Sequence, residues 1–179
     1  MLEFILKCIY LMLPAYFANM APVLSHKINF LNYPVDFNKK FMGKPIFGSH
    51  KTWRGLFFGT IAGILVAYVQ HLLQYNYPFF ASLSFFYYYN WLAIGFLLGF
   101  GALCGDLVKS FFKRRVGIKP GARFIPWDQI DYSIGSLLFV SIAFVPSWQI
   151  IVTVIVASFI LHVLVNHIAY YLKLSKVKW

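Results

Sequence analysis

The sequence has few charged residues, and acidic residues are the scarcest of them. Only 12% of its 179 residues are charged, while 60% are hydrophobic and 21% are aromatic. A soluble domain carries roughly 25% charged residues. Sixteen Lys and Arg residues face only five acids. This composition argues against a water-soluble globular enzyme, and the few acids become the first feature to explain.

Cysteine is scarce as well. Cys8 and Cys104 both lie in apolar segments and follow no spacing motif. They are therefore expected to be core residues rather than a disulfide or a metal-binding pair. The N-terminus carries Glu3 but no basic segment and no small-residue cleavage site. We therefore expect a retained first membrane span rather than a signal peptide.

Long stretches without charge dominate the rest of the chain. Asp106 is the only charged residue within 55–108, and 132–172 has none. Apolar runs of about 18 residues or more indicate transmembrane helices. We expect an all-α integral membrane protein, with residues 1–179 as a single membrane domain. Its five expected spans cover about 4–24, 55–74, 90–108, 132–147 and 149–172.

Two of these spans have particular features. Pro14, Asn19 and Pro22 predict an irregular first helix. The fourth span is short, and its helix can extend back toward Trp127. In the third span, Gly95 and Gly99 form a G-x-x-x-G pattern, which favours close packing against another helix of the same chain.

Basic residues gather in two loops and in the C-terminal tail. The loops cover 25–54 and 109–131, and the tail holds Lys173, Lys176 and Lys178. With five spans, all three segments share one side of the membrane. The positive-inside rule places them in the cytoplasm and the N-terminus outside. We therefore expect a multi-pass protein of the cell membrane with its C-terminus and active site cytoplasmic.

The loops also limit the substrates. Neither loop is long enough to fold into an independent domain. Any chemistry must then occur at the membrane face, on lipids or on a lipid and a soluble compound. With no soluble domain to read a groove, no nucleic-acid partner is expected, and no protein partner is predicted.

Asp106 is the first of three clustered acids. An ionisable residue in a membrane span is a functional-site hypothesis by default. If the helix continues, Lys109, Ser110 and Lys113 share a face with Asp106. The alternative is an Asp at a helix end, paired with Lys109 or Lys113.

Asp128 and Asp131 complete the cluster, and Pro126 is a plausible first-turn residue of their helix. Two such close carboxylates repel each other unless a cation lies between them. Mg²⁺ prefers oxygen ligands, often carboxylates together with substrate phosphates. We therefore predict a Mg²⁺ site formed by Asp106, Asp128 and Asp131. The alternative is that Asp128 and Asp131 only stabilise a helix N-terminus. Glu3 and Asp36 are assigned no role.

Basic residues near these acids suggest a phosphate site. Lys113, Arg114 and Arg115 can neutralise phosphate oxygens opposite a metal ion. Membrane topology and anionic headgroups would also explain such residues. The segment 48–55 (Gly-Ser-His-Lys-Thr-Trp-Arg-Gly) has the composition of a phosphate-binding turn, although it is not a Walker P-loop. His162 and His167 are expected to be neutral, hydrogen-bonded helix residues, and His26 and His71 interface residues.

Three motifs resemble those of the CDP-diglyceride synthetases (phosphatidate cytidylyltransferases). Residues 105–119 resemble their G-D-L-x-x-S-x-x-K-R-x-x-x-x-K stretch, 128–131 resemble D-R-x-D, and 49–55 are similar to S-P-K-K-T-x-E-G. The sequence departs from the pattern at Pro120, which replaces an acid, and at Gln129, which replaces an Arg; the family's His-Gly-Gly is absent. The compact size and the Asp-Gln-Ile-Asp version look more like the archaeal branch, the CDP-archaeol synthases. The motifs cover roughly 44–135.

The resemblance implies a Mg²⁺-dependent nucleotidyltransferase of phospholipid biosynthesis. Such an enzyme transfers CMP from CTP to an unsaturated isoprenoid ether lipid phosphate and releases pyrophosphate. It implies that Asp106, Asp128 and Asp131 hold the metal, and that Lys113, Arg114 and Lys119 stabilise developing charge and the leaving pyrophosphate. It also implies substrate contacts from Ser49, Lys51, Thr52, Ser110 and Arg123. CTP, the lipid phosphate and membrane lipids are the expected partners.

Three other functions stay open at this point. A phosphatidate cytidylyltransferase would use the same chemistry on an acyl lipid. A CDP-alcohol phosphotransferase also clusters Asp residues at the membrane face, but its acids are spaced i,i+4 after an upstream D-G that is missing here. A small transporter would need polar residues spread through the membrane, whereas these acids are expected at one face.

Overall fold

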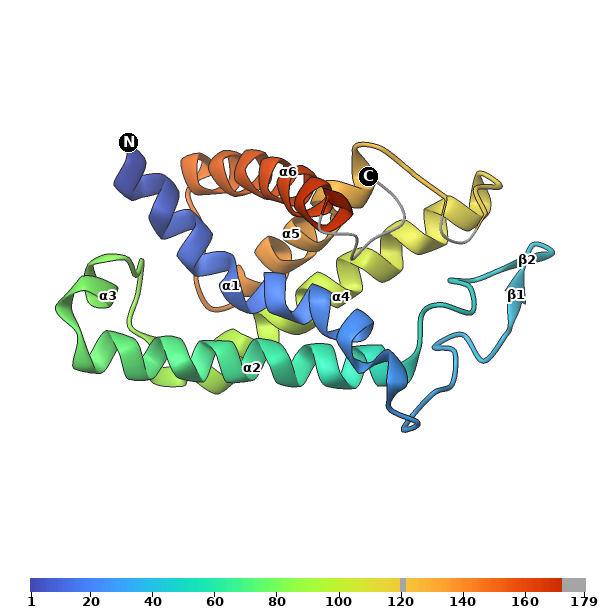
Figure 1. Ribbon diagram of the computed structural model, residues 1–179, viewed down its shortest axis with the longest axis horizontal. Helices are drawn as coiled ribbons and strands as arrows, with labels where there is room; N and C mark the ends of the chain where they lie inside the picture. The colour runs from blue at the N-terminus through green and yellow to red at the C-terminus, as the bar shows by residue number, and fades with distance from the viewer. Residues whose placement is uncertain (120–121, 172–179) are drawn as a thin grey trace.

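The computed structural model describes residues 1–119 and 122–171, and most of these are helical (Figure 1). Pro120, residue 172 at the end of the last expected span, and the three tail lysines lie outside the described residues. The elements run α1 (Leu2–Leu24), η1 (Ser25–Lys27), β1 (Lys40–Phe41), β2 (Lys44–Pro45), α2 (Trp53–Asn76), α3 (Pro78–Ser82), η2 (Tyr88–Asn90), α4 (Trp91–Arg115), α5 (Trp127–Val140) and α6 (Trp148–Tyr171).

The described residues contain four helices long and apolar enough to cross a membrane. They are α1, α2, α4 and α6. Helix α5 has 14 residues, fewer than the roughly 20 that a complete span requires. It begins at Trp127 and ends at Val140, so the expected span over 132–147 is misplaced. An open segment with a turn joins it to α6.

Two further expectations differ from the structure. Helix α1 is continuous although Pro14 and Pro22 lie inside it; neighbouring structure compensates for the missing N–H donors in such cases. Helix α4 continues past residue 108 to Arg115, so the start of the expected loop 109–131 is helical. Lys113, Arg114 and Arg115 occupy its last turn, where positive charge favours the helix dipole.

Glycines let α4 approach two helices at backbone distance. A Cβ added to Gly63 of α2 would lie 2.8 Å from the Cα of Gly99, which confirms that the G-x-x-x-G pattern packs within the chain. On the other side of α4, a Cβ on Gly105 would lie 2.2 Å from the carbonyl oxygen of Asp131. A Cβ on Gly135 would lie 2.2 Å from the carbonyl oxygen of Gly101. This contact places the turn that carries Asp106 against the turn that carries Asp131.

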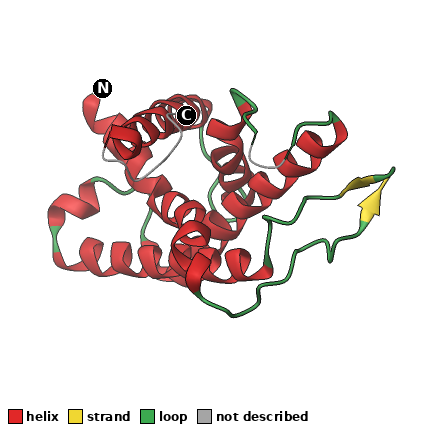
Figure 2. Ribbon diagram, turned by 45° about the vertical axis from the view of Figure 1, so that its right-hand side comes forward, coloured by secondary structure: helices red, strands yellow, loops and turns green. Residues whose placement is uncertain are grey.

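The first basic loop leaves the helical body and returns as a small hairpin (Figure 2). Strands β1 and β2 pair antiparallel, with Phe41 opposite Lys44. Arg115, at the end of α4, donates hydrogen bonds to the carbonyl oxygens of Phe41, Lys44 and Pro45. Lys44 in turn donates to the Arg115 carbonyl at 2.9 Å. The hairpin is therefore attached to the C-terminal end of α4.

Asp36 organises the remainder of this loop, although it was assigned no role from the sequence. Its side chain is buried and accepts backbone N–H groups from Asn38 at 3.0 Å, Phe47 at 2.9 Å and Gly48 at 3.0 Å. Burial raises the pKa of Asp36, but the hydrogen bonds from Gly48, Phe47 and Asn38 outweigh it and hold that pKa below its usual value. The carboxylate therefore stabilises the loop fully at pH values above the usual Asp pKa. This contribution is lost as the pH falls through the lowered pKa of Asp36.

The α4–α5 contact predicts a large effect of one methyl group. Gly135→Ala would force its Cβ into the Gly101 carbonyl, and overpacking of this kind costs about 1–3 kcal/mol. We expect a lower midpoint of thermal unfolding in detergent. Leu138→Ala is the matched control, because that side chain lies on the same helix and is 67% exposed. A Gly135→Ala protein that melts with the wild type would show that the contact is not tight.

The Asp36 contacts predict a loosened loop in Asp36→Ala, since this substitution leaves three backbone donors without their acceptor. Hydrogen–deuterium exchange should speed up by about tenfold or more across 36–48, in line with the loss of buried hydrogen bonds. Lys40→Ala, at an exposed position in the same loop, should exchange like the wild type. Unchanged exchange in Asp36→Ala would contradict the assigned role.

Candidate active site

A polar cavity of about 390 Å³ lies where the first loop, α4 and α5 meet. Its lining is mostly charged or polar and comes from segments far apart in the sequence. The loop supplies Gly48, His50 and Lys51, and α4 supplies Asp106, Lys109, Ser110, Lys113 and Arg114. Arg123, Asp128, Gln129 and Asp131 come from α5 and the segment before it, while Asn19 of α1 and His162 and Asn166 of α6 complete the wall.

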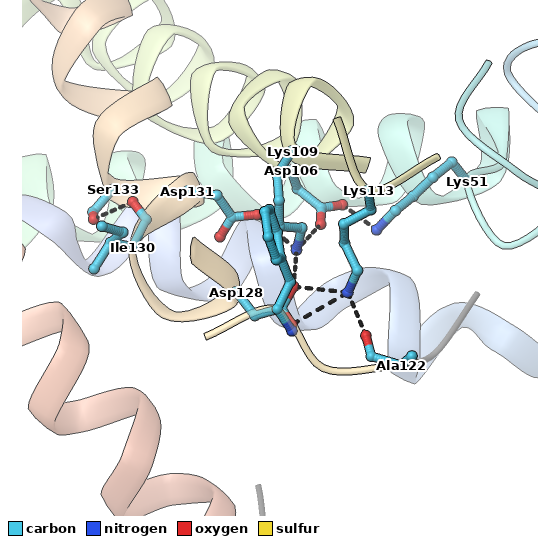
Figure 3. A network of polar contacts seen from close by, with 10 residues as sticks. Lys51, Asp106, Lys109, Lys113, Ala122, Asp128, Ile130, Asp131 and Ser133 are labelled. Atoms are coloured by element: carbon cyan, nitrogen blue, oxygen red, sulfur yellow. Dashed lines mark hydrogen bonds and ion pairs between the residues drawn. The ribbon is translucent and has the colours of Figure 1, made fainter. Parts of the chain in front are cut away.

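Three carboxylates converge on one ammonium group in this cavity (Figure 3). The Lys109 Nζ lies 3.0 Å from Asp106 Oδ1, 3.0 Å from Asp128 Oδ1 and 2.8 Å from Asp131 Oδ2. The sequence therefore correctly groups the three acids, but the structure places a lysine at their centre.

Two more lysines contact the same carboxylates from outside. Lys51 pairs with Asp106, and Lys113 pairs with Asp128 at 3.1 Å. Lys113 also donates to the carbonyl oxygen of Ala122. Asp128 in addition accepts the backbone N–H of Phe124 at 2.6 Å. The cluster thus balances three negative charges with three positive ones.

Asp128 and Asp131 titrate differently despite their proximity. Burial raises the pKa of Asp128, but Lys109, Lys113 and the Phe124 N–H outweigh it and bring that pKa below its usual value. Asp131 is more deeply buried, and this burial, only partly offset by Lys109, raises its pKa to about 6. Both groups are therefore mainly ionised at neutral pH, and Asp131 is the first of the two to take up a proton.

The donor set suits a hard divalent ion in chemistry but not in its present spacing. Carboxylate oxygens are the ligands that Mg²⁺ prefers, at about 2.0–2.1 Å. Here the three oxygens surround the ammonium at 2.8–3.0 Å. Within 1–119 and 122–171, no three His, Cys, Asp or Glu side chains stand close enough to hold an ion as they are.

The structure brings together most of the predicted site residues. Lys51, Ser110, Lys113, Arg114 and Arg123 all line the cavity with the three acids. Other predicted contacts do not reach it. Ser49 and Lys119 are exposed and outside the lining.

Thr52 also lies outside the main cavity and has a local structural role. Its hydroxyl accepts the Gly55 N–H at 3.2 Å and caps α2, and it faces a smaller neighbouring pocket.

Several lining residues were not predicted from the sequence. The sequence placed Lys109 on the helical face of Asp106 and left their pairing as an alternative, which the structure shows, but assigned Lys109 no role in the site. His162 was interpreted as an ordinary helix residue, yet it faces the cavity together with Asn166 and Asn19. No local pattern predicts that α1 packs against α4 or that α6 packs against α5 and α1, so these residues needed the tertiary structure.

An apolar groove of about 510 Å³ adjoins the polar cavity along α4 and α5. Its walls include Val108, Phe112, Trp127 and Leu138, and each of these side chains is at least half exposed. Lys109 and Asp131 line both the groove and the polar cavity. A molecule with a charged head and apolar chains can therefore occupy both spaces at once.

Comparison with known proteins agrees with this architecture. A solved structure described as an intramembrane enzyme for archaeal membrane lipid biosynthesis superposes with a TM-score of 0.73 at 30% identity, covering 90% of this chain and 94% of the other. The CDP-archaeol synthase of Archaeoglobus fulgidus is 38% identical over 100% of both chains. That of Pyrococcus furiosus is 36% identical over 98% of both.

The family assignment rests on the complete chain rather than on the motifs alone. A family model described as CarS-like CDP-archaeol synthase matches residues 1–179. Together with full-length relatives above 30% identity and the charged cavity at the ends of membrane helices, this match shows that the chain belongs to the CDP-archaeol synthase family.

Proposed function

We propose that this protein transfers CMP from CTP to an unsaturated archaeal ether lipid phosphate, forming a CDP-archaeol-type lipid and pyrophosphate. The observation that carries the proposal is the position of a basic and acidic cavity directly beside an apolar groove, with Lys109 and Asp131 in both. The names of the full-length relatives support the same activity. A nucleoside triphosphate suits the cavity, and isoprenoid chains suit the groove.

The reaction needs positioning and charge neutralisation more than a protein base. A phosphate monoester has its second pKa near 6 and is already anionic at neutral pH. One of its oxygens attacks the α-phosphorus of CTP in line; the new P–O bond forms as the α–β bridging P–O bond breaks. The electron pair leaves with pyrophosphate. Alignment and preorganised charge then supply the rate enhancement.

The basic residues of the cavity are suited to hold the phosphates. Arg114 is buried and lines the cavity, and a guanidinium can bind phosphate oxygens in a bidentate manner. Lys51 pairs with Asp106, and Lys113 pairs with Asp128. Phosphate oxygens can replace the carboxylates as ion-pair partners of these lysines. Lys51 and Lys113 then stabilise the charge that develops on the leaving pyrophosphate. Arg123 and Ser110 supply further donors.

Mg²⁺ is the cofactor that we assign to the site. Asp106, Asp128 and Asp131 would hold it, because their carboxylates provide hard oxygen ligands at one place. A bound Mg²⁺ supplies charge neutralisation on the triphosphate oxygens. His50 and Asn19, also in the lining, provide hydrogen-bonding groups that can orient the substrates.

The orientation that we propose follows the distribution of basic residues. The hairpin loop and the end of α4 carry Lys44, Lys51, Lys113, Arg114 and Arg115 on the same side as the cavity. The positive-inside rule then assigns the cavity to the cytoplasm. The C-terminal halves of α1 and α6 reach the cavity through Asn19, His162 and Asn166. We therefore place the N-terminus outside and the C-terminus in the cytoplasm, with α5 and the segment after it together returning the chain to the outer face. CTP would enter from the cytoplasm.

The activity can be tested with the purified protein in detergent. Labelled CTP, Mg²⁺ and unsaturated geranylgeranyl ether phosphate should give a labelled lipid and pyrophosphate in equal amounts. Phosphatidate assayed in parallel should react more slowly, while an equal or faster rate would favour the acyl-lipid alternative. Release of CMP from a CDP-lipid would instead indicate a CDP-alcohol phosphotransferase. Solute flux in liposomes without nucleotide turnover would indicate a transporter.

The role of the carboxylates predicts strong losses in Asp128→Asn and Asp131→Asn. Each should lower kcat/KM by about 100-fold or more, as when one preorganised electrostatic group is removed. Glu3→Gln is the matched control, because this carboxylate is 70% exposed and pairs only with Lys7 among the described residues. If both Asp variants fold, as judged by thermal unfolding, and retain near wild-type rates, the metal assignment is wrong.

A further inference from the structure

Lys109 occupies a position that no other cation in the described ranges shares. Its ammonium contacts Asp106, Asp128 and Asp131 simultaneously, whereas Lys51 and Lys113 each pair with only one of these carboxylates. The side chain of Lys109 is only 13% exposed. Figure 3 shows its nitrogen between the three carboxylates.

The arrangement answers an electrostatic problem. Three carboxylates at such short separation repel one another, and burial increases the cost because water screens them less. A cation at their common centre removes most of this repulsion. Lys109 reaches that centre from α4, one helical turn after Asp106. The three carboxylates are thereby held together by a cation of the chain itself.

The same centre is the place that a divalent ion would take. An ion that contacts all three carboxylates would lie between them and draw their oxygens in to about 2.0–2.1 Å. The space between them is the one that the Lys109 ammonium occupies, at 2.8–3.0 Å from the same oxygens. Two cations cannot share one position. Occupancy by Lys109 and occupancy by the ion are therefore mutually exclusive.

We propose that Lys109 is a resident cation that occupies the position between the three carboxylates and has to leave it before a divalent ion binds there. The inference rests on the proposed function, since it takes the three carboxylates as ion ligands. Lys109 is then a positioning residue that preserves the ligand geometry and sets the apparent affinity for the ion. Its long flexible stem permits such a movement, and the cavity provides space for the displaced ammonium beside the phosphates.

The size of the effect follows from competition. When the binding-competent state is a minor one, the apparent dissociation constant rises by the inverse of its population. Minor states are typically populated at 0.1–10%. Removing the competing ammonium should therefore tighten ion binding by about tenfold or more. A lysine that merely stabilises the fold would have no such effect, and one that assists the ion would have the opposite effect.

The test measures Mn²⁺ binding to the purified full-length protein in detergent at pH 7.5, without CTP or lipid, from the electron paramagnetic resonance signal of free Mn²⁺. Lys109→Met keeps most of the length of the side chain but removes its charge. It should bind Mn²⁺ about tenfold or more tightly than the wild type. Lys7→Met removes a partly buried lysine that pairs with Glu3 at 3.0 Å and lies outside the cavity lining; it should bind like the wild type. Equal or weaker binding by Lys109→Met overturns the proposal.

Two further measurements cover a Lys109→Met protein that folds poorly. Without Mn²⁺ this variant should unfold at a lower temperature than the wild type. Saturating Mn²⁺ should abolish this difference, because the ion replaces the missing charge. Lys109→Arg retains the charge and adds donors, so it should bind Mn²⁺ more weakly than the wild type. The inference is contradicted if Mn²⁺ does not raise the unfolding temperature of Lys109→Met to that of the wild type. It is also contradicted if Lys109→Arg binds Mn²⁺ with wild-type affinity.

These outcomes are independent of the transfer reaction. If the wild type transfers CMP in a Mg²⁺-dependent manner while Lys109→Met shows no gain in Mn²⁺ affinity, the proposed function stands and the resident-cation inference fails. If Lys109→Met gains affinity but the wild type makes no CDP-lipid, the inference about the ion site stands and the proposed activity fails.

Discussion

The contact between α4 and α5 is the constraint on which the candidate site depends. Gly105 and Gly135 allow the two backbones to meet at a distance that any side chain would prevent. Asp106 follows Gly105 directly, and the carbonyl of Asp131 lies where a Gly105 side chain would be. The approach of two apolar helices thus sets the separation of two buried carboxylates. Membrane helices associate through this kind of close packing, because lipid provides no hydrophobic force between them.

The first loop completes the site from the opposite direction. Asp36 gathers the backbone N–H groups of Phe47 and Gly48, and the hairpin is attached to the end of α4 through Arg115. The loop then delivers Lys51 to Asp106. An exposed segment with little core of its own is held in place by one buried carboxylate and one guanidinium, which explains how a membrane protein with short loops can form a polar cavity.

The parts predicted from the sequence were those encoded in short, local patterns. Charge-free apolar runs indicated the helices, and the rarity of acids singled out Asp106, Asp128 and Asp131 before any motif was considered. Helix ends were less accurate: the basic residues after 108 were interpreted as a loop, although positive charge at a helix C-terminus favours continuation of α4. The role of Asp36 was missed because its partners Phe47 and Gly48 lie 11 and 12 residues further along the chain. The position of His162 at the cavity could not be predicted because it depends on the packing of α6 against α5 and α1. The central position of Lys109 likewise depends on α5 lying against α4.

The apolar groove and the polar cavity share a border, so the proposed enzyme can bind its lipid reactants from the bilayer and its water-soluble reactants from the aqueous side. Lys109 and Asp131 stand on that border. A lipid in the groove would present its headgroup to the cavity while its chains stay at the level of the bilayer, so neither substrate nor product has to be extracted into water. The water-soluble compounds would enter and leave the polar cavity from the aqueous side. Each reactant then has its own route to the site, and the lipid phosphate and the triphosphate come together where the groove and the cavity join.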